Sequence, residues 1–196
     1  MDKSELKRLK ARWSPQQTLQ GAASLSAESD SSFPVVDDEY IDLRGLLITK
    51  ILKNAAIKSV DLSGAKLENF AQFSMCRVEK TRFNFASLQT NFGNSFIACE
   101  FKSACLSSAV LRARFEACDF SMADLSGTRG NERHFVGCNF TGTNFRKAIL
   151  LHCVFEDCKF ENCKFHNGSF AFSTFVRSPI NDSELGNTLM EKVIFT

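Results

Sequence analysis

A five-residue repeat of apolar residues constrains this sequence more than any other feature. Every fifth residue from Phe115 to Phe195 is apolar, with Gly130 as the exception. In most repeats a small residue, such as Cys118 or Ala123, stands two places before the apolar one. A period of five fits neither the 3.6-residue period of an α-helix nor the alternation of an ordinary strand. The chain is therefore interpreted as a structural repeat.

The same spacing begins near Tyr40 and changes phase several times before Phe115. Between Leu88 and Phe96 two interpretations stay open: two shortened steps through Phe92, or one step with a three-residue insertion. Slips of this kind are tolerated at the corner of a coil, where a bulge leaves the inward residues in place. The apolar positions before Phe115 are Leu47, Leu52, Ile57, Leu62, Leu67, Phe73, Val78, Phe83, Leu88, Phe96, Phe101, Leu106 and Leu111.

These repeats resemble the pentapeptide-repeat family, whose consensus is roughly A-(D/N)-(L/F)-(S/T/N)-x. The resemblance covers about residues 45–196 and rests on segments such as VDLSG at 60–64, CDFSM at 118–122, ADLSG at 123–127 and CNFTG at 138–142. It implies an all-β fold, a right-handed quadrilateral β-helix (solenoid) of about 7–8 coils. In that fold each pentapeptide makes one side of a square.

Four pentapeptides per coil sort the inward residues into columns. One predicted column contains Phe96, Phe115, Phe135, Phe155, Phe175 and Phe195. A second predicted column contains four of the eight cysteines, Cys99, Cys118, Cys138 and Cys158. We interpret these cysteines as small core residues, because a free thiol packs as a small hydrophobe. A metal or redox ladder is the alternative, and Cys105, outside the small position, is predicted to be the exposed thiol.

Residues 1–39 differ in composition from the repeat at 40–196 and are predicted to form an N-terminal helix and a Ser-rich linker, partly disordered. Asp2 and Glu5 have capping-box spacing, and Leu6, Leu9 and Trp13 share one helical face. A helix over 2–13 is too short to stand alone. We expect it to dock on the open end of the rod, with a partner-binding or membrane-surface helix as the alternative.

The charge of the chain is weak and unevenly spread. Residues 1–39 carry five Lys/Arg and seven Asp/Glu, whereas residues 40–196 carry 19 and 15, a net charge of +4. The rod is neither basic enough to predict direct nucleic-acid binding nor acidic enough to imitate DNA. Without a signal peptide or a membrane span, the sequence predicts a cytoplasmic protein with free thiols and no membrane contact.

No catalytic pattern is present in the sequence. The three histidines His134, His152 and His166 lack a nucleophile and a carboxylate at recognisable spacing, and no phosphate-binding loop occurs. We therefore predict no enzyme activity, no cofactor and no metal site.

Two irregularities predict an interaction surface. Gly130 leaves a core column empty and Arg133 occupies a small inward position, so we expect this side to open into a polar loop or to form a simple corner irregularity. Apolar residues outside the core phase predict a protein contact on two adjoining faces. They are Val110, Val136, Ile149, Leu151, Val154, Val176, Leu189 and Ile194.

The resulting function prediction is a non-catalytic protein-interaction scaffold with an unidentified partner. The unpaired last coil at 189–196 predicts a homodimer joined near the C-terminal end, a mode for which the family is known. The alternative comes from the quinolone-resistance members, which mimic DNA and bind DNA gyrase or topoisomerase IV. A third, weaker hypothesis is nucleic-acid or membrane-surface binding through Arg112, Arg114, Arg129, Arg133, Arg146 and Lys147.

Overall fold

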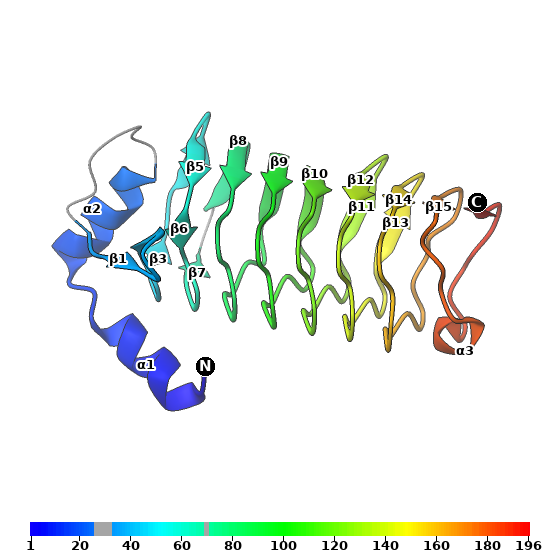
Figure 1. The fold of residues 1–196 in the computed structure, drawn as a ribbon, viewed down its shortest axis with the longest axis horizontal. Helices are drawn as coiled ribbons and strands as arrows, with labels where there is room; N and C mark the ends of the chain where they lie inside the picture. Colours follow the sequence, from blue (N-terminus) through cyan, green and yellow to red (C-terminus); the bar gives the residue numbers. More distant parts are fainter. Residues whose placement is uncertain (26–32, 69–70) are drawn as a thin grey trace.

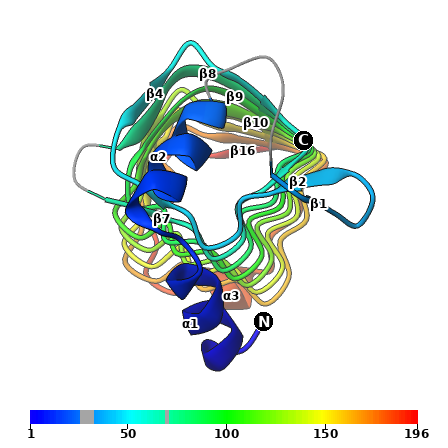
Figure 2. The same ribbon diagram turned by 90° about the vertical axis from the view of Figure 1, so that its left-hand side faces the viewer.

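The chain forms a β-solenoid of about eight turns with two short helices at its N-terminal end (Figure 1). The computed structural model describes residues 1–25, 33–68 and 71–196. Viewed from the N-terminal end, the turns stack one behind another around a common interior (Figure 2).

The helices are α1 (Lys3–Ala11), α2 (Pro15–Ser24) and α3 (Asp182–Leu185). The first eight strands are β1 (Val35–Val36), β2 (Tyr40–Asp42), β3 (Leu47–Ile48), β4 (Ile51–Lys53), β5 (Ala56–Lys58), β6 (Val60–Asp61), β7 (Lys66–Leu67) and β8 (Gln72–Glu79). The remaining strands are β9 (Asn91–Ile97), β10 (Val110–Glu116), β11 (Arg129–Asn131), β12 (His134–Val136), β13 (Ile149–Leu151), β14 (Val154–Glu156), β15 (Thr174–Val176) and β16 (Ile194–Phe195).

Strands of successive coils pair in parallel, and their register confirms the predicted phenylalanine column. Phe115 is paired with Phe135, and Phe155 is paired with both Phe135 and Phe175. The rings of Phe135 and Phe155 are stacked, with centroids 4.9 Å apart and planes inclined by 5°. All the members of this column except Phe195 are buried, so the aromatic rings fill the interior of the rod.

The repeat length follows from a backbone corner two residues after most inward side chains. Ala117, Met122 and Asp157 adopt left-handed conformations there, with φ of 50°, 59° and 51°. The consensus Asp or Asn supports the turn, because its side chain accepts a hydrogen bond from the backbone two residues on. Asp119 Oδ1, for example, accepts from the Ser121 amide at 2.9 Å.

The structure settles the phase changes that the sequence predicts. Phe92 is buried and pairs with Phe73 and Leu111, so the segment from Leu88 to Phe96 contains two shortened steps. One position was wrong: Leu47 is only half-buried, and Ile48 is the inward residue, paired with Leu67. Two adjacent aliphatic residues left the sequence pattern ambiguous at that point.

The N-terminal segment contains one helix that the sequence analysis predicted and one that it missed. Asp2 caps α1 by accepting the Glu5 amide at 2.8 Å. The linker prediction is wrong for Pro15–Ser24, which form α2 behind a reciprocal capping box of Ser14 and Gln17. Residues 26–32 of the predicted disordered linker lie outside the described residues.

Both helices pack on the N-terminal part of the rod, with α2 over its open end and α1 at its edge (Figure 2). Leu9 is buried, and the Trp13 indole Nε1 donates to the Arg44 carbonyl at 2.9 Å. A Cβ placed on Gly21 of α2 would lie 3.1 Å from Leu46 Cδ1, which shows how closely this helix covers the first coil. Helix α2 therefore covers the first layer of the core, whereas α1 packs against the corner residues Gly45 and Gly64.

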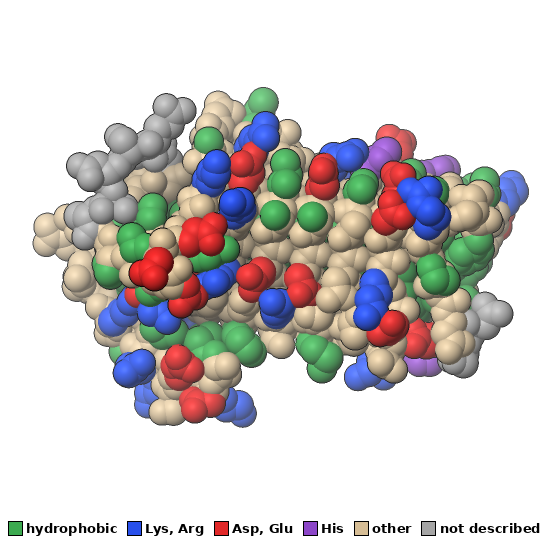
Figure 3. Space-filling model, viewed as in Figure 1, with side chains coloured by type: hydrophobic (Ala, Val, Ile, Leu, Met, Phe, Trp, Pro, Cys, Tyr) green, Lys and Arg blue, Asp and Glu red, His purple; other side chains and the backbone are tan. Residues whose placement is uncertain are grey.

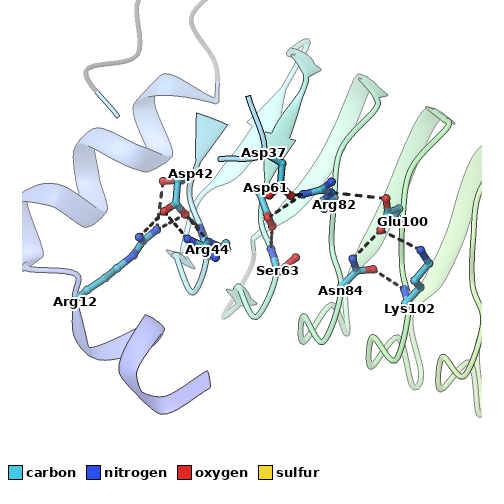
Figure 4. A network of polar contacts seen from close by, with 10 residues as sticks. All are labelled: Arg12, Asp37, Asp42, Arg44, Asp61, Ser63, Arg82, Asn84, Glu100 and Lys102. Carbon is cyan, nitrogen blue, oxygen red and sulfur yellow. Dashed lines mark hydrogen bonds and ion pairs between the residues drawn. The ribbon is translucent and has the colours of Figure 1, made fainter. Parts of the chain in front are cut away.

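A partly buried ion cluster fastens the helices to the rod (Figure 4). The Asp42 carboxylate, only 5% exposed, accepts two hydrogen bonds of 2.7 Å from Arg12 and bonds of 2.9 and 3.0 Å from Arg44. Burial alone would raise the pKa of Asp42, but the hydrogen bonds from both guanidinium groups outweigh it and hold that pKa well below its usual range. A neighbouring ladder continues along the coils, with Arg82 Nη1 3.7 Å from Asp61 and its Nε 3.7 Å from Glu100.

The predicted core register can be tested at Phe155. We expect Phe155→Ala to lower the free energy of unfolding by about 3–5 kcal/mol, because it removes a stacked ring from a closed interior. Urea denaturation followed by circular dichroism measures the loss. Phe172→Ala is the control, since its ring is exposed and lies outside the core. Equal losses in the two variants would contradict the register.

The Asp42 cluster predicts an acid-sensitive N-terminal cap. Because the folded-state pKa of Asp42 is lowered, its contribution is complete at neutral pH and declines as the pH falls below about 4, the pKa of an unperturbed carboxyl. We expect Asp42→Asn to weaken docking of α1 by on the order of 2 kcal/mol and to remove this pH dependence. Hydrogen exchange of the α1 amides measures it, with the exposed Asp37→Asn as control. Unchanged exchange in Asp42→Asn would refute the role of the cluster.

Candidate interaction surfaces

Gly130 lies inside a strand and not in a loop, so the predicted polar loop is wrong. It belongs to β11, which pairs with β10 and with β13, where Gly130 is opposite Leu150. The inserted residue is Glu132, which adopts a left-handed φ of 58° and restores the five-residue step that β10 had shortened. The irregularity is absorbed as one extra corner residue, which is the alternative that the sequence left open.

A hollow lies on the side of the rod beside Gly130. Leu111 and Leu150 occupy the same column in the neighbouring coils, whereas Gly130 contributes only backbone and is half-buried. The hollow has a volume of about 480 Å³. Its lining combines aliphatic residues with three arginines, and includes Val110, Ile149, Leu151, Arg112, Arg129 and Arg133.

Arg133 turns its guanidinium away from the interior. Its Nη1 donates to the Arg112 carbonyl at 2.8 Å and its Nε donates to the Asn131 carbonyl at 2.5 Å. The side chain is half-buried, and its Cγ would lie 3.3 Å from a Cβ on Gly130. As expected for a charge at a small inward position, it is not buried unpaired.

The outward aliphatic residues fall into separate groups along the rod. Val110, Ile149 and Leu151 gather at the hollow. Val136 and Val176 share a column in which Glu156 separates them. Val154 lies between His134 and Thr174, and the last two candidates, Leu189 and Ile194, are exposed near the end of the chain.

The C-terminal end of the core is only partly covered. Phe195 stacks on Phe175 with ring centroids 5.2 Å apart, yet it remains 54% exposed. Its strand β16 is paired on one side, with β15, and no described strand pairs with the other. A second hollow of about 420 Å³ lies here, lined in part by Phe175, Ile180 and Phe195. Apolar side chains and an open strand edge therefore coincide at this end.

Helix α3, which the sequence analysis did not predict, replaces part of one side in the last coil. Glu184 in this helix accepts hydrogen bonds from the backbone amides of Asn162 and Cys163 at 2.7 and 3.1 Å. It thereby takes the place of a strand partner for the preceding coil. The five-residue count continued through Ile180 and Leu185 and concealed this change.

The cysteines behave as core residues. Seven are buried and Cys105 is half-buried. The Sγ atoms of Cys118 and Cys158 lie 3.4 Å from the carbonyl oxygens of Phe96 and Phe135. Burial raises the pKa of Cys153 to about 11 and that of Cys163 to about 12, so these thiols are protonated at neutral pH.

No group of three or more potential metal-ligating side chains is assembled within residues 1–25, 33–68 and 71–196. Among the same residues, no helix has both the length and the apolar character to cross a bilayer.

Charges of both signs are interspersed along the rod (Figure 3). One outward column runs through Asp61, Arg82, Glu100, Asp119, Asn139 and Lys159. Its sign therefore changes along the rod.

Thiol accessibility gives a direct test of the cysteine assignment. We expect one thiol, Cys105, to react with a maleimide in the native protein, and the seven buried thiols to react only after unfolding. Mass spectrometry of labelled peptides identifies the site, and Cys105→Ser provides the control. Rapid native labelling of Cys118 or Cys138 would contradict the packed ladder.

Comparison with known proteins agrees with this geometry. Residues 108–188 match the family model described as a pentapeptide repeat region. No curated protein sequence matches the chain.

Among solved structures, trypsin-treated QnrB1, a plasmid-mediated fluoroquinolone resistance protein, is 19% identical, with 71% of this chain and 91% of that chain covered and a TM-score of 0.38. HetL, a pentapeptide repeat protein involved in heterocyst differentiation regulation in the cyanobacterium Nostoc, is 14% identical, with coverages of 92% and 94% and a TM-score of 0.36. The five-residue repeat, the parallel coils and the family match together identify residues 108–188 of this chain as a pentapeptide repeat region.

Proposed function

We propose that this protein is a non-catalytic protein-interaction scaffold, a rigid rod that presents two contact surfaces. One surface is the hollow at Gly130, and the other is the C-terminal coil. The observation that carries the proposal is the half-exposed Phe195, which continues the core column up to an open strand edge. A large aromatic ring left at the end of a packed column supplies apolar area that a protein contact would bury.

A second copy of the chain is the proposed occupant of the C-terminal end. A two-fold contact would bring two Phe195 rings together and extend the aromatic column from one rod into the next. It would also cover the neighbouring apolar side chains of Leu189 and Ile194, both of which are more than half exposed. The eight unpaired cysteines support a reducing compartment, such as the cytoplasm, for this scaffold.

Binding to DNA gyrase or topoisomerase IV as a DNA mimic is the alternative function. Such mimicry requires a continuous row of negative charge. The outward column at Asp61 instead places Arg82 next to it and ends in Lys159. This charge pattern favours the scaffold over the mimic.

The dimer contact predicts concentration-dependent association. We expect the protein to sediment as a dimer, and Phe195→Lys or Ile194→Lys to sediment as a monomer, because a charge would be buried against its own copy. Sedimentation velocity measures the change, and thermal unfolding verifies that each variant is folded. Leu19→Lys, an exposed position on α2 at the other end of the rod, serves as the control. A monomeric unmodified protein over a wide concentration range would refute the contact.

A further inference from the structure

The hollow at Gly130 contains two arginines that have no anionic partner within the described chain. Arg112 projects from β10 and Arg129 from β11, and both side chains are exposed. Neither guanidinium makes a hydrogen bond or an ion pair with the residues that the structure describes. In contrast, Arg12 and Arg177 on the same protein are each held by carboxylates.

The pairing register brings the two free arginines to the same opening. Arg129 is opposite Val110, so Arg112 is its diagonal neighbour across the two strands. Diagonal positions on adjacent strands are about 7–8 Å apart, within the reach of long side chains. Both arginines line the same hollow, so their guanidinium groups can reach one ligand.

Aliphatic side chains form part of the wall of the hollow. Val110 and Ile149 occupy the same outward column as Arg129, one coil to either side. Leu151 is paired with Asn131 and closes the other side. A ligand must therefore carry an anionic group and an apolar group close together.

The remaining charges indicate which kind of anion fits. Arg133 already donates to two carbonyl oxygens, which leaves Arg112 and Arg129 as the two groups with all their donors free. Glu132 also lines the hollow and would repel a doubly charged phosphate more strongly than a carboxylate. Planar carboxylates match the fork geometry of guanidinium groups. The aliphatic neighbours do not extend the positive charge along the rod, as a nucleic-acid backbone would require.

We propose that the Gly130 hollow binds the carboxylate of an aspartate or glutamate that stands beside an aliphatic residue on a partner protein. Arg112 and Arg129 hold the carboxylate, and Val110 and Ile149 contact the aliphatic side chain. The inference rests on the proposed scaffold function and specifies the kind of side chain that this contact surface would bind.

Nuclear magnetic resonance titration with two short capped peptides tests the proposal. The probes are acetyl-Leu-Glu-Leu-amide and acetyl-Leu-Gln-Leu-amide, which differ only in the charge of the central side chain. We expect the glutamate peptide to shift the Gly130 amide and the Nε–H signals of Arg112 and Arg129, and to bind about tenfold more tightly than the glutamine peptide, as for one charge-assisted hydrogen bond.

Arginine variants localise the effect. We expect Arg112→Gln and Arg129→Gln to remove the preference for the glutamate peptide, and Arg146→Gln to retain it, because Arg146 is exposed but does not line the hollow. Equal affinity for the two peptides, or a preference that survives both substitutions, would overturn the proposal. It would also be overturned if inorganic phosphate or a short DNA duplex bound at these residues more tightly than the glutamate peptide.

The same samples separate this inference from the scaffold itself. Sedimentation of the unmodified protein and of Arg112→Gln reports the dimer independently of the hollow. If the protein sediments as a dimer but does not bind the glutamate peptide, the proposed carboxylate ligand is refuted and the proposed C-terminal contact stands. If the protein sediments as a monomer but prefers the glutamate peptide, the C-terminal contact is refuted and the carboxylate ligand stands.

Discussion

Stacking of each coil's inward side chains on those of the next coil is the interaction on which the rest of the structure depends. Phe115, Phe135 and Phe155 lie almost parallel, with ring planes inclined by 3° and 5° along the column. Stability in such a rod accumulates between neighbours, so each end needs a substitute for the missing coil. At the N-terminal end α2 and the following Leu25 provide it, whereas Phe195 at the C-terminal end is 54% exposed.

The stacking also explains why an irregularity in the sequence becomes a feature of the surface. A column cannot shift at one coil without disturbing the coils on both sides, because interiors are close-packed. The extra residue Glu132 is therefore accommodated outwards, as a corner residue beside the hollow. The neighbours Leu111 and Leu150 remain buried in their column.

The sequence predicted the features that the five-residue period determines, namely which residues point inwards and how they align between coils. The phenylalanine column and the buried cysteines follow from counting alone, since every coil repeats the same backbone. Counting also placed Cys105 outside the core but predicted an exposed thiol, whereas Cys105 is half-buried. The capping box of Ser14 and Gln17 was a sequence signal for α2, but the Ser-rich composition led to the prediction of a linker. Counting could not give the Asp42 cluster, because Arg12 reaches it across 30 residues.

The candidate surfaces were predicted less well than the core for a related reason. The period gives the position of an outward residue but not the conformation of its side chain. Arg133 was located correctly, yet its hydrogen bond to the Arg112 carbonyl depends on a residue in the preceding coil. In the same way, the period does not show that Val110, Ile149 and Leu151 line one hollow.

In this rod the inward side chains form the core and the outward side chains are free to vary, so residues that bind a partner are expected among the outward ones. Parallel backbone pairing holds the coils together whatever the outward side chains are, so an exposed arginine such as Arg112 or Arg129 is not required by the fold. A ligand that covers these two guanidinium groups must displace their hydration water. Only a complementary negative charge compensates for that free-energy cost. The two unpaired guanidinium groups and the aliphatic side chains beside them are the features that support the proposed carboxylate ligand.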